Sequence, residues 1–92
     1  MDMRYRQNLH TAGRVIDGQA FVVTPKDNRM HSLNETATRL WQLAKHGCTA
    51  EDVVTMLTSE FEVDGETARA DVQTCIDDLL AREILLVDDK SE

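Results

Sequence analysis

Residues 14–33 read RVIDGQAFVVTPKDNRMHSL, and this stretch decides the fold. Asp17 and Gly18 lie between two runs that are rich in apolar and β-branched residues. Asp-Gly favours a tight type I′ hairpin turn, because both central residues of that turn need a positive φ. We therefore predict a hairpin with one strand near 14–16 and a second near 19–24.

The residues after this hairpin predict one more strand. Residues 25–28, Pro-Lys-Asp-Asn, are typical of a turn, and Pro25 ends the second strand because proline cannot donate a ladder hydrogen bond. Residues 29–33 then alternate and predict a short third strand. Three short strands cannot bury both faces of a sheet, so helices must cover one of them.

Three helices are expected after the strands. Asn34 is a good N-cap for the first, in which apolar residues recur with helical spacing until Gly47 ends it. Thr49 is the expected cap of the second helix. Asp64 is the expected cap of the third helix, residues 65–82, which is the longest. A short apolar run, 84–87, follows as a final strand or a core-covering extension.

The expected fold class is therefore α+β. It resembles a winged helix-turn-helix, with a three-stranded N-terminal antiparallel sheet followed by a three-helix bundle. Residues 1–13 are expected to form a flexible arm, 14–87 the domain, and 88–92 a solvated tail. One shared core is expected to contain Val15, Phe21, Val23, Leu40, Trp41, Leu57, Val72, Ile76 and Leu79.

Length and charge narrow the class of protein further. The chain has 92 residues, enough for one core, and its net charge is -7. Residues 1–46 carry seven basic and four acidic residues, whereas 47–92 carry three basic and thirteen acidic ones. Neither a signal peptide nor an apolar membrane span is present, so we expect a cytoplasmic protein with Cys48 and Cys75 as free thiols.

Motifs for catalysis are absent from the sequence. His10, His31 and His46 are scattered, and the two cysteines form no CxxC pair. The chain has no GxSxG and no glycine-rich phosphate loop. We therefore expect no metal, no cofactor and no enzyme activity.

DNA binding is the alternative that a winged-helix outline invites. Binding to a duplex depends on Lys and Arg side chains that neutralise phosphates. The expected third helix and its end carry Arg69 and Arg82 against five acidic residues, and the second helix has no basic residue. The charges therefore disfavour nucleic acid as a partner.

Four segments of the chain share their order and spacing with one family. They are Leu33–Ala37 followed by Leu40 and Trp41, then Gly47–Thr49 with Val53, then Phe61–Val63, and then Asp71 and Val72 with Ile76, Leu79 and Leu80. Together they resemble the PqqD family over roughly residues 14–87. His46 stands where the family often has Asp, and the 22–26 segment also departs from its pattern. Membership in the family therefore implies peptide binding more strongly than quinone synthesis.

The resemblance implies a function as well as a fold. PqqD-like domains are RiPP recognition elements, which act as peptide chaperones. They bind the leader segment of a ribosomally made precursor peptide and present it to a modifying enzyme, often a radical-SAM protein. In PqqD itself the product of the pathway is pyrroloquinoline quinone.

The expected binding mode is β-augmentation, in which a leader adds as a strand to residues 29–33 and fills a groove beside the third helix. The candidate peptide-binding residues are Arg29, Met30, His31, Ser32, Leu33, Arg69, Val72, Gln73 and Ile76. Six of these, Met30, Ser32, Arg69, Val72, Gln73 and Ile76, are expected to line the groove with their side chains. A degenerate DNA-binding regulator and a structural subunit of a larger complex remain open as alternatives. The sequence leaves the precursor, the product, the enzyme partner and the oligomeric state undetermined.

Overall fold

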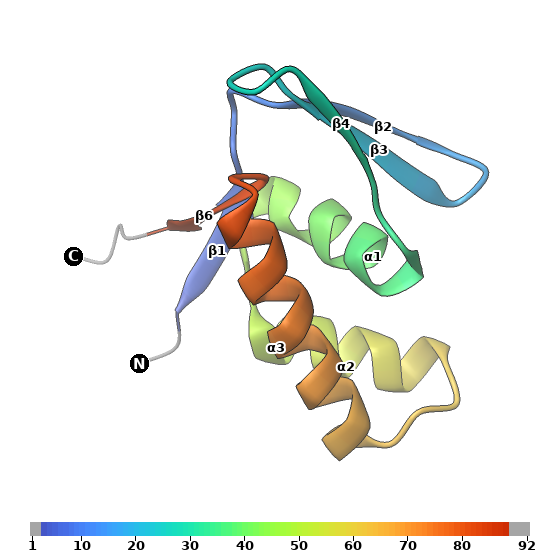
Figure 1. Ribbon diagram of the computed structural model, residues 1–92. Helices are drawn as coiled ribbons and strands as arrows, with labels where there is room; N and C mark the ends of the chain where they lie inside the picture. The colour runs from blue at the N-terminus through green and yellow to red at the C-terminus, as the bar shows by residue number, and fades with distance from the viewer. Residues whose placement is uncertain (1–2, 89–92) are drawn as a thin grey trace.

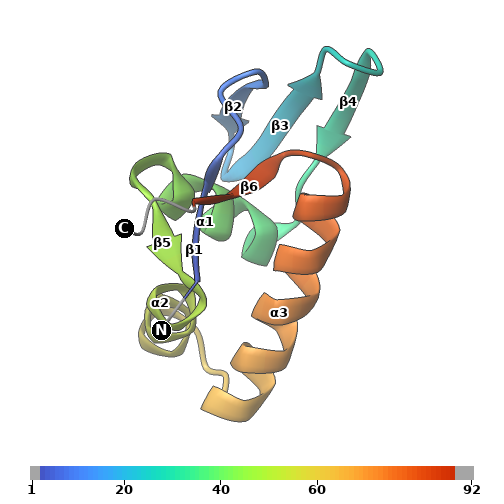
Figure 2. The ribbon, with the colours of Figure 1, turned by 90° about the vertical axis from the view of Figure 1, so that its left-hand side faces the viewer.

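A three-stranded antiparallel sheet lies over a group of three helices (Figures 1 and 2). The computed structural model describes residues 3–88. The sheet contains β2 (Ala12–Ile16), β3 (Gln19–Thr24) and β4 (Arg29–Ser32) in the order β2-β3-β4, so β4 is an edge strand. The predicted α+β class and three-stranded sheet are confirmed.

The turns of this sheet have the predicted conformations. Asp17 and Gly18 have φ angles of 53° and 80°, the positive values that a type I′ turn requires. At the next turn, the Asn28 amide donates to the Pro25 carbonyl at 3.3 Å, and Asn28 has a φ of 56°. The segment that decided the fold in the sequence is therefore formed by its own local chemistry.

The three helices begin at the predicted caps. They are α1 (Glu35–Leu43), α2 (Ala50–Glu60) and α3 (Gly65–Ala81). Side-chain oxygens of Asn34, Thr49 and Asp64 accept hydrogen bonds from the amide three residues later, which satisfies a donor that has no partner within the helix. The bond from the Thr67 amide is also the main cause that lowers the pKa of Asp64.

The end of α1 is tighter than an α-helix. A 3-10 turn, η1 (Ala44–His46), continues the chain to Gly47, whose φ of 86° suits glycine. The chain then enters the short strand β5 (Cys48–Thr49).

The N-terminal segment differs from its prediction. It contains β1 (Arg4–Gln7), which pairs antiparallel with both β5 and β6 (Leu85–Asp88) in a second sheet of order β5-β1-β6. The expectation of a flexible arm is therefore wrong for this strand, whose Tyr5 is buried. The cause is its sequence, RYRQ, in which no apolar alternation marks a strand. Residues 1–2 and 89–92, including most of the expected tail, lie outside the described residues.

The helices and the inner face of the first sheet share one core. The predicted core residues of the helices, Leu40, Leu57, Val72, Ile76 and Leu79, are buried, and Trp41 packs against them half-buried. The prediction for β3 was wrong by one position. Ala20 and Val22 of β3 face the helices and are fully buried, whereas Phe21 and Val23 point to the outer face, and Val15 is exposed.

A close contact between α1 and β3 explains this choice of face. The Thr38 hydroxyl on α1 accepts a hydrogen bond from the Ala20 amide at 3.0 Å and donates to the Leu33 carbonyl at 3.2 Å. A small residue at position 20 allows that approach, which the larger Phe21 would prevent. No helix of residues 3–88 is long and apolar enough to cross a membrane.

Candidate functional site

The open edge of β4 presents backbone groups to a ligand. The Leu33 amide donates to the Ala20 carbonyl on β3 at 2.9 Å. Backbone direction alternates along a strand, so His31 also bonds toward β3, while the N–H and C=O groups of Met30 and Ser32 point to the open edge. No further strand lies beyond β4 in the part of the chain that the structure describes.

Side chains on β4 alternate between the two faces of the sheet. Met30 and Ser32 are in register with Val23 and Phe21, so their side chains lie on the outer face. Arg29, His31 and Leu33 belong to the inner face. Met30 and Ser32 therefore offer backbone groups at the edge, and the expectation that their side chains line a groove against α3 is wrong.

His31 connects β4 to the end of α3. Its Nε2 lies 3.0 Å from Thr24 Oγ1, and its Nδ1 lies 3.3 Å from Nη1 of Arg82, the residue that caps α3. The Thr24 hydroxyl donates to the Asp27 carboxylate, and this bond is the main cause that lowers the pKa of Asp27. At this end, polar contacts therefore join β4 to α3, the two elements that were expected to flank the leader groove.

One stripe of α3 lies on the side of the helix that is turned toward β4. Asp71, Cys75, Asp78 and Arg82 recur at i, i+4, i+7 and i+11, which places them on one side of the helix. Because Arg82 contacts His31, this side is the one turned toward β4. Arg82 Nε also pairs with Asp78 Oδ1 at 3.1 Å. We call these four residues the acidic stripe.

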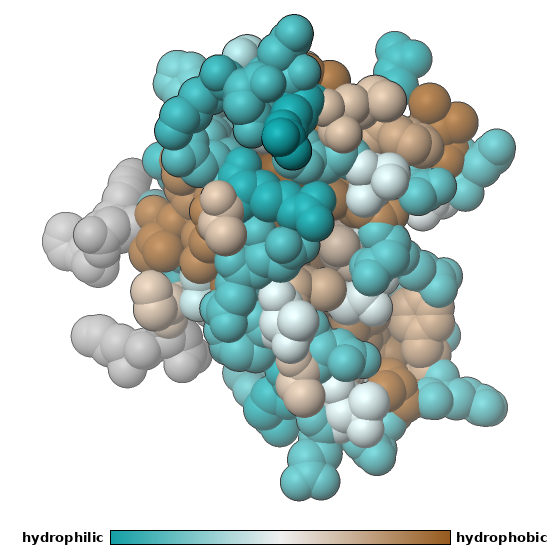
Figure 3. Space-filling view, viewed as in Figure 1, coloured by the Kyte–Doolittle hydropathy of each residue, from teal (hydrophilic) through white to brown (hydrophobic). Residues whose placement is uncertain are grey.

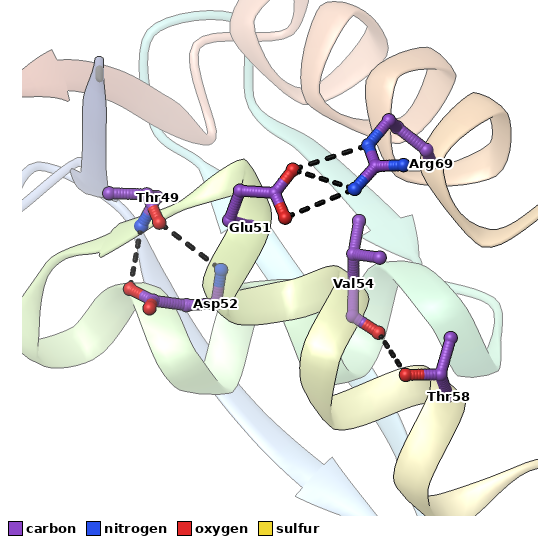
Figure 4. Close-up of polar contacts among 6 residues, drawn as sticks. All are labelled: Thr49, Glu51, Asp52, Val54, Thr58 and Arg69. Carbon is purple, nitrogen blue, oxygen red and sulfur yellow. Dashed lines mark hydrogen bonds and ion pairs between the residues drawn. The ribbon is translucent and has the colours of Figure 1, made fainter. Parts of the chain in front are cut away.

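The helix residues chosen from the sequence lie elsewhere on α3. Val72 and Ile76 are fully buried in the core, so neither side chain is open to a ligand in this structure. Arg69 lies on the opposite flank and pairs with Glu51 at the start of α2, at 2.9 Å (Figure 4). Gln73 is on the same flank and bonds to Asp77 at 3.0 Å.

The sequence contained a signal for the stripe that is turned toward β4. Once Val72, Ile76 and Leu79 define the core direction of α3, a turn of about 100° per residue places Asp71 and Cys75 on one flank and Arg69 and Gln73 on the other. What the sequence could not give is which flank meets β4. The contact between His31 and Arg82 decides that point.

The two thiols show no sign of activation. Burial raises the pKa of Cys48 to about 11, with a further contribution from Asp52. Burial also raises the pKa of Cys75, as do the charges of Asp71 and Asp78. Both thiols are therefore protonated at neutral pH, which is unfavourable for a nucleophile or a metal ligand. No group of three or more potential metal ligands occurs among residues 3–88.

Fold and site together define a small α+β domain whose sheet ends in an open edge strand beside the acidic stripe of its longest helix. Residues 19–85 match the family model described as "Coenzyme PQQ synthesis protein D (PqqD)". The chain belongs to the PqqD family. The resemblance that the sequence motifs predicted is confirmed.

Two solved structures share this fold. One, described as "TbiB1 in Complex with the TbiA(beta) Leader Peptide", has a TM-score of 0.80 at 18% identity and covers 95% of this chain and 99% of its own. The other, "Lasso peptide synthetase B1 complexed with the leader peptide", has a TM-score of 0.78 at 24% identity, with 89% and 96% covered. No curated protein matches the chain.

Proposed function

We propose that this chain is a peptide-recognition domain. It binds the leader segment of a ribosomally made precursor peptide as an added strand on β4 and presents that peptide to a modifying enzyme. The observation that carries this proposal is the open backbone edge at Met30 and Ser32, next to the contact between His31 and Arg82 at the end of α3. Membership in the PqqD family and the leader peptides bound to both similar structures support it.

At this edge, the backbone and the side chains of the leader would contribute to binding in different ways. The N–H and C=O groups of Met30 and Ser32 would bond to the leader backbone, which supplies affinity with little dependence on sequence. Leader side chains alternate, so every second one enters the groove against the acidic stripe. Asp71 and Asp78 then favour a Lys or Arg in the leader and disfavour acidic clusters. The shortness of β4 and the charge of Arg29 limit pairing with other strands.

The proposed role is recognition and presentation without catalysis. The raised pKa values of Cys48 and Cys75 support this view, because a protonated thiol is a weak nucleophile. The modifying enzyme, such as a radical-SAM protein, would carry out the chemistry, and pyrroloquinoline quinone synthesis is one pathway of this kind. We infer further that the fold is a winged helix-turn-helix in which the third helix contacts a bound peptide instead of DNA.

An amide chemical-shift titration tests the proposed site. The peptide is the leader of the precursor encoded nearest the gene for this chain. We expect the largest shifts at Met30, Ser32 and the acidic stripe, because these groups face the edge and the groove. Shifts confined to the opposite flank, at Arg69 and Gln73, would disprove the site. A lack of shifts at high peptide concentration would contradict the proposed function.

Duplex DNA is expected not to bind at physiological salt. The described part of α3 carries Arg69 against Glu66, Asp71, Asp77 and Asp78, so its surface repels phosphates. A fluorescence-anisotropy titration with promoter DNA from the same locus measures this, and a poly-lysine peptide serves as the binding control. Micromolar or tighter binding to one sequence at that salt concentration would contradict the prediction.

A further inference from the structure

The outer face of the β2-β3-β4 sheet is a second surface, next to the backbone edge that the proposed leader site uses. In Figures 1 and 2 the helices lie on one side of this sheet, and no described element covers the other. The strand registers place Ile16, Phe21, Val23 and Met30 together on the uncovered side. In Figure 3, hydrophobic side chains gather at the upper right, over the β2–β3 hairpin. We call these four residues the outer apolar face.

Large apolar side chains on this face are exposed to solvent. Met30 is 69% exposed and Ile16 is 49% exposed, and a shallow apolar hollow joins them to Phe21 and Val23. The outward-facing residues of these strands do not pack in the core, where the inner positions of β3 are Ala20 and Val22. Polar residues could therefore occupy the outer positions without loss of core packing. Contiguous exposed apolar patches of this kind mark interaction surfaces.

The proposed leader site extends this same face. Met30 and Ser32 present their backbone groups to the open edge and their side chains to the outer face. A leader strand added to β4 therefore has every second side chain on the outer face, next to Met30 and Ser32. The outer apolar face becomes one strand wider when the leader is bound, so a protein that docks there contacts chain and leader together.

We infer that the outer apolar face docks the enzyme that modifies the precursor peptide, and that this enzyme recognises the chain and the leader as one surface. The inference rests on the proposed function and adds the surface for its second partner. Arg14 is the one charged side chain on this face of the three strands, and it has no ion pair within residues 3–88. The matching enzyme surface is apolar, with an acidic residue opposite Arg14.

A second copy of the chain is a poorer occupant of this face. In a two-fold symmetric dimer the same patch meets itself, so each Arg14 would face the same apolar residues or the other Arg14. No acidic side chain lies on the outer side of these strands to pair with it. The charge pattern therefore favours a different protein.

Paired binding measurements on the full chain test this inference. The probes are the fluorescein-labelled leader of the precursor encoded nearest this gene, measured by anisotropy, and the purified modifying enzyme encoded beside it, measured by calorimetry with and without leader. Ile16→Lys places a charge on the outer apolar face from β2, far from the leader edge. Leu9→Lys is the matched control, because Leu9 is 84% exposed and lies outside the sheet.

We expect Ile16→Lys to weaken enzyme binding roughly tenfold or more, because the new charge would have to be buried in an apolar contact. Its affinity for the leader should stay within about twofold of wild type. Arg14→Glu should weaken enzyme binding in the same direction, and Leu9→Lys should change neither affinity. Wild-type chain should bind the enzyme more tightly when the leader is present.

Three other results would overturn the inference. One is a wild-type chain that binds the leader but not the enzyme. Another is an Ile16→Lys chain that binds the enzyme as tightly as the wild-type chain does. Sedimentation that shows a wild-type dimer broken by Ile16→Lys would assign the face to a second copy. If the wild-type chain binds no leader, the proposed function itself is contradicted. The anisotropy measurement detects that outcome independently of enzyme binding.

Discussion

Replacing Ser32 with proline is expected to weaken leader binding by about tenfold or more, because a leader carbonyl would lose its donor at the edge of β4. Proline has no N–H, and the amide of Ser32 is one of the groups that point away from β3. The same change removes no hydrogen bond between β3 and β4. Fluorescence anisotropy with the labelled leader measures the loss, and thermal unfolding checks that the fold is kept.

Two matched variants separate the backbone effect from its alternatives. Ser32→Ala keeps the amide and should bind the leader within about twofold of wild type, because the serine side chain lies on the outer face. His31→Pro removes an amide that points to β3 and should instead destabilise the sheet. If Ser32→Pro and Ser32→Ala bind the leader equally well, the leader does not pair with this edge.

Replacing Ile76 with alanine is expected to lower the free energy of unfolding by about 2–5 kcal/mol. Ile76 is fully buried where α3 packs into the core, so the shorter side chain leaves a cavity among close-packed neighbours. Urea unfolding followed by circular dichroism measures the change. A loss of this size is a large fraction of the total stability of a small domain.

Gln73→Ala is the matched control for this variant, one turn away on the same helix. Gln73 is exposed, so its replacement should change stability by no more than about 0.5 kcal/mol. Under conditions where both variants are folded, leader affinity should remain near the wild-type value, because neither side chain faces the groove. If Ile76→Ala left the stability unchanged but weakened leader binding, we would conclude that Ile76 lines the groove instead of filling the core.

Local chemistry made most of the fold predictable from the sequence. Asp17 and Gly18 specify their turn, and Asn34, Thr49 and Asp64 specify where the helices begin, because each depends on residues within three positions. β1 escaped prediction because its pairing partners lie about 45 and 80 residues away in the sequence. Nothing within RYRQ itself requires a strand.

The faces of the strands were harder to predict than their positions. Both faces of β3 carry apolar residues, so alternation alone could not distinguish Ala20 and Val22 from Phe21 and Val23. The approach of α1, through the hydroxyl of Thr38, made the smaller pair the inner one. The same limit applied to α3, where the sequence identified the amphipathic helix but not the flank that meets β4.

The pairing of β1 with β6 has a consequence for how this domain could be carried by a larger protein. Arg4 and Asp88 are direct neighbours across the two strands, so a chain attached before one and a chain attached after the other would leave from the same point. Figure 1 places that point on the side opposite the tip of the β2–β3 hairpin. A fused enzyme could therefore be tethered at either end with the same reach, and a short tether would raise its effective concentration at the domain without crossing the hairpin.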